Sequence, residues 1–167
     1  MIARVLLSIA ALSATLTACG VATIATSSTP TTITPTTSTI AAGERQVPGI
    51  IDYFQQPQHT VVIAHYTITV STPFEVEIST FGDGCVRSGG ADVQVIGLQA
   101  EVFVYDYTTR SFQTPCTQEL KRLTRTVKVQ FAEAGEVLII VHGVRVGPET
   151  SSMDGVPATL EQTITIQ

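Results

Sequence analysis

Residues 126–141 read TVKVQFAEAGEVLIIV, and this run is the clearest indication of how the chain folds. From Thr126 to Phe131, apolar and polar side chains alternate, which is typical of a half-buried β-strand. Residues 133–136 predict a hairpin turn, and Val137 to Val141 are apolar at every position. A strand that is apolar on both faces is expected at the centre of a sheet. The run therefore predicts two strands of an all-β domain, the second of them central.

The same period of two recurs on both sides of this run. The domain is rich in Val, Ile and Thr and has no Trp, which favours strands over helices. We expect about seven or eight antiparallel strands, separated by turns that contain Gly or Pro. The only segment with a helical pattern is 117–123, and it is one or two turns long at most. The other predicted strands are 50–54, 60–70 with a bend at His65-Tyr66, 74–78, 91–96, 100–107 and 159–166.

This arrangement of short strands resembles an immunoglobulin-like or fibronectin-like β-sandwich. It departs from antibody domains, because it lacks a core Trp and has no Tyr two residues before Cys116. Cys85 and Cys116 are also too close in sequence for the usual bridge between the two sheets. The resemblance therefore implies only the general sandwich class, with an open β-barrel as the alternative, and a fold class does not specify a function.

The first 18 residues have the three parts of an export signal: Arg4, an apolar run from Val5 to Leu12, and small residues before Cys19. The apolar run is shorter than the roughly 20 residues that a membrane-spanning helix needs. Leu16-Thr17-Ala18-Cys19 resembles the lipobox of bacterial lipoproteins. The resemblance implies cleavage between Ala18 and Cys19, a diacylglyceryl group on the Cys19 sulfur, and acylation of the new amino terminus. Ordinary cleavage after Ala18 is the alternative.

Lipidation of Cys19 implies a location as well as an anchor. Each buried CH2 group contributes about 0.8 kcal/mol, so two or three acyl chains hold a protein on a membrane almost permanently. Position 20 is Gly, not Asp. The resemblance to the sorting rule of diderm bacteria then implies the outer membrane, and in a single-membrane host the outer face of the cell membrane.

The rest of the chain divides into a linker and one domain. Residues 19–43 carry no charge and consist largely of Thr, Ser, Ala and Pro, which predicts a disordered spacer. Residues 44–167 have the length of a single domain. The formal net charge of −5 argues against a nucleic-acid partner. Cys85 and Cys116, in an exported domain, predict one disulfide. Free thiols or a metal-binding pair are the alternatives.

No group of residues predicts a metal site. His59, His65 and His142 do not stand at HxH or HExxH spacing. Two Gly-rich stretches, 81–85 and 88–92, group too few carboxylates for calcium. We predict that they are tight turns in which Gly supplies a positive φ.

Two surface features have a functional and a structural interpretation. Tyr105-Asp106-Tyr107 either exposes two aromatic rings to a sugar or partner, or belongs to a half-buried strand. A basic cluster either meets anionic lipid headgroups or an acidic partner, or is a solvated surface. Its members are Lys121, Arg122, Arg125 and Lys128.

We predict neither catalytic residues nor a cofactor, because the chain has no GxSxG motif and no paired acids. The predicted function is that of a membrane-anchored lipoprotein whose domain is a binding or interaction module of the cell envelope. Its partners would be the membrane, through Cys19, and an envelope protein or glycan. An enzyme with a site assembled from separate loops, or a structural component of an envelope assembly, are the alternatives.

Overall fold

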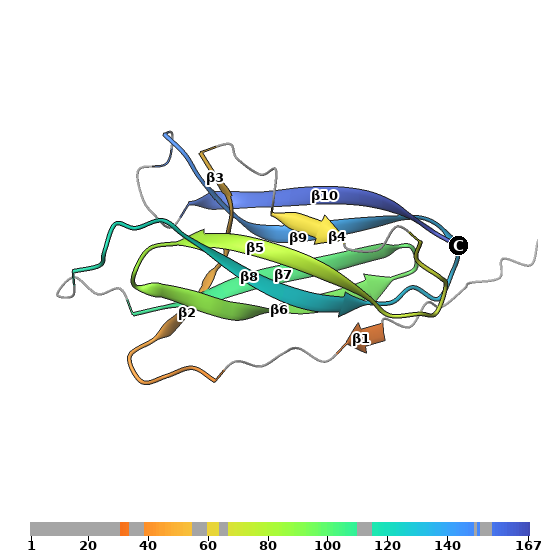
Figure 1. Cartoon of the computed structure of the whole chain (residues 1–167), viewed down its shortest axis with the longest axis horizontal. Helices are drawn as coiled ribbons and strands as arrows, with labels where there is room; N and C mark the ends of the chain where they lie inside the picture. Colours follow the sequence, from red (N-terminus) through yellow and green to blue (C-terminus); the bar gives the residue numbers. More distant parts are fainter. Residues whose placement is uncertain are drawn as a thin grey trace, which may run out of the picture.

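A computed structural model of the chain describes residues 31–33, 39–54, 60–63, 67–109, 115–148, 150 and 155–167 (Figure 1). Regular structure in these residues is β-strand throughout, as the alternating patterns predict. The described residues form no helix that could cross a membrane. The predicted signal peptide with its Ala18–Cys19 cleavage site, most of the linker, and His59 and His65 lie outside the described residues.

Ten strands are found in the described part of the chain, and hydrogen bonds connect them into one mixed sheet. The predicted number was lower, and the expectation of antiparallel pairing throughout was wrong. The strands are β1 (Thr31–Ile33), β2 (Arg45–Pro48), β3 (Ile50–Tyr53), β4 (Val61–Ile63), β5 (Phe74–Gly82), β6 (Val86–Ile96), β7 (Gln99–Thr108), β8 (Lys121–Val129), β9 (Gly135–Val146) and β10 (Val156–Ile166).

β9 is a central strand, as its doubly apolar sequence predicts. It pairs antiparallel with β10 along its whole length and parallel with β7 from Leu138 to His142. β7 also forms an antiparallel hairpin with β6, and Gly97 in the turn between them has a φ of +58°. Because parallel neighbours need a crossover connection, the chain leaves β7, forms β8 in another part of the sheet, and returns as β9.

The turn at 133–136 is therefore not a hairpin, contrary to the sequence prediction. β8 pairs with β5, whereas β9 pairs with β7, β10 and β3. The segment between β8 and β9 carries the chain from one part of the sheet to the other, and Phe131 within it is buried and stacks on Phe74 with 6.2 Å between ring centroids. Alternation predicted both strands correctly, but it contains no information on their partners.

β3 joins the two parts of the sheet. It pairs parallel with β9, and antiparallel with β5 through the single pair Ile50–Phe81. β5 also pairs with β4 and β8. In Figure 1, β5 and β8 lie across β6 and β7, and Arg125 of β8 donates a hydrogen bond to the Gly90 carbonyl of β6 at 3.0 Å. The β5–β8 part of the sheet therefore packs over its β6–β7 part.

The core lies between these two parts of the sheet. It follows the predicted alternation: Val76 and Ile78 of β5, Val102 of β7, and Ile139 and Val141 of β9 are all fully buried. Burying one such side chain contributes about 1.5–3 kcal/mol relative to leaving it exposed. The period-two pattern therefore identifies the inward face of these strands correctly.

Three further segments differ from prediction. Residues 115–120 have no regular structure and Lys121 begins β8, so the predicted helix at 117–123 is wrong. Thr31–Ile33, in the predicted linker, pair with β6 as β1; Thr and Ile favour strands and the edge of β6 offers a partner. Among the described residues of the predicted strand 60–70, Val61–Ile63 form β4 and Ile68 makes an isolated bridge to Ile166.

Candidate binding cleft

β7 and β9 pair only as far as Phe103 and His142. Beyond that point the two strands take different partners: β2 pairs with β7, and β3 pairs with β9. Gly49 stands where they part, donating its N–H to the Val104 carbonyl at 3.0 Å and accepting from the Val144 N–H at 2.9 Å. A Cβ at this position would lie 2.6 Å from Thr80 Cγ2, so the close packing requires Gly.

A cleft of about 670 Å³ opens at this end of the molecule. It is bordered by β2, β3, the turn after β5, and residues 116–120. Its size falls within the range of about 300–1,000 Å³ that is usual for small-molecule sites. The apolar side chains that line it include Ile50, Tyr53, Phe81, Val86 and Leu120.

An aromatic group extends from the cleft to the surface. The rings of Tyr53 and Phe81 lie 6.0 Å apart, and Phe54 packs edge-on against Tyr53 at 4.6 Å. Phe54 is 47% exposed and has a φ of +52°. Its N–H donates to the Val146 carbonyl at 2.8 Å, which ties this residue to the end of β9. A positive φ is unusual for a bulky residue, and such strain is concentrated at functional sites.

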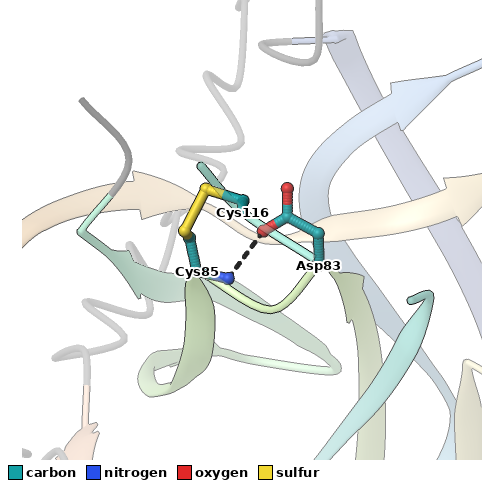
Figure 2. A group of neighbouring side chains, drawn as sticks. All are labelled: Asp83, Cys85 and Cys116. Atoms are coloured by element: carbon teal, nitrogen blue, oxygen red, sulfur yellow. Dashed lines mark hydrogen bonds between the residues drawn. A yellow bond between two sulfur atoms is a disulfide. The ribbon is translucent and has the colours of Figure 1, made fainter. Parts of the chain in front are cut away.

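The opposite wall is formed by residues 115–120, with Leu120 50% exposed. The predicted disulfide between Cys85 and Cys116 is present, with 5.3 Å between the Cα atoms, and ties this wall to the start of β6 (Figure 2). A second tie is the hydrogen bond from the Gly84 N–H to the Thr117 carbonyl at 3.1 Å. The wall lies so close to the turn that a Cβ at Gly84 would be 1.8 Å from Thr117 Oγ1.

The turn at 81–85 is tight, as predicted, and the disulfide holds it. Its glycines are required by close approach, since the positive φ angles of the described glycines occur elsewhere, at 43, 97, 135 and 155. The second Gly-rich stretch, 88–92, is not a turn: β6 continues through it with a bulge between Ser88 and Ala91. That prediction was wrong because a glycine pair in a strand signals a bulge as well as a turn.

Asp83 lies beside the disulfide. Its Oδ1 accepts a hydrogen bond from the Cys85 N–H at 2.9 Å, and a carboxylate oxygen and both sulfurs lie within 4.8 Å of one another (Figure 2). Metal binding by cysteine requires thiolates. With Cys85 and Cys116 joined, this group of three residues does not offer a set of metal ligands.

The structure excludes Tyr105 and Tyr107 as an exposed contact surface. The two rings do share one face, 5.9 Å apart, but the residues are only 9% and 3% exposed. The Arg87 guanidinium lies over the Tyr107 ring at 4.4 Å, and Arg87 Nε donates to Glu44 Oε1 at 2.5 Å. Burial is the main cause that raises the pKa of Tyr105. Arg87 Nη2 also donates to the Thr39 carbonyl at 2.9 Å, so the end of the predicted linker is hydrogen-bonded to the side chain that lies over the Tyr107 ring.

The structure divides the basic cluster, because Arg122 and Lys128 are exposed whereas the side chain of Arg125 is buried. Its Nη2 pairs with Asp106 Oδ1 at 2.5 Å, and the two side chains are 7% and 2% exposed. Arg125 Nη1 donates to the Gly90 and Tyr105 carbonyls at 3.0 and 2.5 Å, and Thr80 Oγ1 donates to Asp106 Oδ2 at 2.7 Å. Sequence reasoning missed this network, although one signal was present: Arg125 stands in the inward phase of β8, between Leu123 and Val127.

The remaining histidine, His142, lies outside the cleft. Its ring stacks on Phe103 with 4.4 Å between centroids, and its Nε2 is 3.5 Å from Glu101 Oε2. One imidazole and one carboxylate on a sheet face do not make a metal site.

No protein-family model, curated protein or solved structure matches this chain. The cleft therefore has to be interpreted from its geometry and chemistry.

Proposed function

We propose that the protein is a bacterial lipoprotein, anchored to the cell envelope through Cys19, whose immunoglobulin-like β-sandwich is a binding module with the cleft as its binding site. The cleft carries the proposal, since it is concave, has the size of a usual binding site, and combines apolar side chains with polar ones that include Asp83 and Asp106. The lipobox at 16–19 and the uncharged linker support the anchored location.

The occupant that the cleft favours is an apolar side chain of a partner protein. The floor offers Ile50 and Phe81, and exposed apolar groups stand on both sides, Phe54 and Leu120. Strand addition at the open edge of β2 is disfavoured, because Pro48 has no N–H to donate. Insertion of a side chain does not need those backbone groups.

The rim of the cleft suits a peptide more than a purely apolar ligand. Arg45 on β2 and Glu119 on the opposite wall both line the cleft and are exposed. Their opposite charges can bind the polar groups that flank an apolar side chain in a peptide.

Site-specific photo-crosslinking tests the cleft. A benzophenone amino acid is placed at Leu120 in the full chain, and intact cells are irradiated. Leu98 is the matched control, because it is also an exposed Leu (38%) but lies on the turn between β6 and β7, outside this cleft. We expect one discrete protein adduct from position 120 and none from position 98. No adduct from position 120, or the same adduct from both positions, would contradict the proposed site.

Detergent phase partition tests the anchor. We expect Cys19→Ser to leave the detergent phase and to accumulate as soluble or unprocessed protein. The Cys85→Ser/Cys116→Ser double variant is the control, and it should stay in the detergent phase because it keeps Cys19. If Cys19→Ser still partitions with detergent, the lipid anchor is rejected.

A further inference from the structure

We propose that the Cys85–Cys116 disulfide is a redox switch for the cleft: its reduction releases the wall at 115–120 while the sheet stays folded. The inference rests on the proposed binding role of the cleft. The reductant is an external dithiol. Its two thiols reduce the bond by two successive exchanges, which leave Cys85 and Cys116 as thiols and the reductant as a disulfide, with protons conserved.

The wall is a segment whose position the disulfide controls. Residues 115–120 are not part of any strand. Their ties include the disulfide at Cys116 and the Gly84–Thr117 hydrogen bond, which stand at adjacent positions of the wall. At the other end, strand pairing begins only at Lys121, opposite Gly82. Once the bond is broken, the segment can turn about Lys121, carrying Glu119 and Leu120 away from the cleft.

The sheet does not depend on the same bond. Cys85 immediately precedes β6, which is held by antiparallel pairing with β7 from Val86 to Ile96. The fully buried Val102, Ile139 and Val141 pack on strands that contain neither cysteine. Local opening of segments with few buried contacts, below the free energy of global unfolding, is a general property of proteins.

The disulfide is also placed where a reductant can reach it. Cys116 lines the cleft, and both cysteines are half-buried. The carboxylate of Asp83 lies within 4.8 Å of both sulfurs.

Solution NMR of the full chain in detergent micelles, with and without dithiothreitol, tests the switch. On reduction we expect backbone order parameters of residues 116–120 to fall from about 0.85 to below about 0.6. Exchange of the Gly84 amide should accelerate, while the amides of Val137–Val141 keep their chemical shifts because the sheet stays folded. The Cys85→Ser/Cys116→Ser variant should show the mobile wall in both conditions. An unchanged wall, or changed chemical shifts in Val137–Val141 as well, overturns the inference.

Fluorescence gives a second readout. The chain has no Trp, so Leu120→Trp introduces a single reporter on the wall, and its emission should shift to the red on reduction.

The crosslinking experiment separates this inference from the proposed function. An adduct from position 120 that does not change with dithiothreitol refutes the switch and leaves the binding site standing. A wall that becomes mobile on reduction, without any adduct in the oxidised state, refutes the binding site and leaves the switch standing.

Discussion

Replacing Arg125 by Met should strongly destabilise the domain, because it breaks a buried ion pair. In the wild type the guanidinium bonds to Asp106 and to two backbone carbonyls, which link β8 to β6 and β7. The variant approximately keeps the volume of the side chain but removes its charge. Asp106 is 1% exposed, and its carboxylate would keep the Thr80 hydroxyl and the Gly89 N–H as described hydrogen-bond donors.

The magnitude follows from this uncompensated charge. Removing one partner of a buried pair costs about 3–5 kcal/mol. For a domain of roughly 120 residues, 1 kcal/mol corresponds to about 4 °C, so the melting temperature should fall by about 12–20 °C. The double variant Arg125→Met/Asp106→Leu should recover most of the loss, because apolar side chains replace both partners.

Guanidinium chloride unfolding at neutral pH measures these free energies. Lys128→Met is the matched control, because Lys128 lies on the same strand but is exposed, and its effect should stay within about 0.5 kcal/mol. A loss of less than about 1 kcal/mol for Arg125→Met would be no larger than the contribution of a typical surface ion pair. That result would refute the reasoning from burial.

Three further perturbations test other contacts. The Cys85→Ser/Cys116→Ser variant should lose about 3–4 kcal/mol in denaturant unfolding, the loop-closure entropy expected for a sequence separation of 31 residues; a loss below about 1 kcal/mol would contradict this account. The hydrogen bond with Arg87 lowers the pKa of Glu44 from 4.5 to about 2, so this ion pair stabilises the folded state fully above pH 4.5 and is lost as the pH falls through about 2. NMR exchange of the Arg87 side-chain N–H groups should follow that titration, and Glu44→Gln should abolish it. Gly89→Ala should cost about 1–3 kcal/mol by thermal unfolding, because its Cβ would lie 2.3 Å from a carbonyl oxygen of β7; an unchanged melting temperature would show that the bulge relaxes.

The position of the cleft follows from the way the sheet divides. Where β7 and β9 part, β2 and β3 supply one partner each, and the chain between them turns at Gly49. The opposite side is a segment without regular structure that a disulfide holds in place. The proposed binding site thus has one side that belongs to the sheet and one side without regular structure that a disulfide ties to the sheet.

Local pattern was sufficient for the buried face of the long strands and for the disulfide. The alternation in β5 and the doubly apolar run in β9 predicted which residues are buried, because side chains on a strand point to its two faces in turn and only one face needs to be apolar when the other meets water. The disulfide could be predicted because the domain contains only two cysteines. The burial pattern could be predicted because it depends on residues that are neighbours in the sequence.

Strand partners and the cleft were decided by tertiary structure. The turn at 133–136 looks like a hairpin locally, yet β8 pairs with β5 and β9 pairs with β7. The local sequence around Tyr105 and Tyr107 does not indicate that both residues are buried. The sequence around Arg125 likewise does not indicate that this residue forms a buried ion pair with Asp106. The lining of the cleft comes from segments as far apart as Arg45 and Leu120. Period and composition describe which face of a strand is apolar, whereas packing of the whole core selects which faces meet.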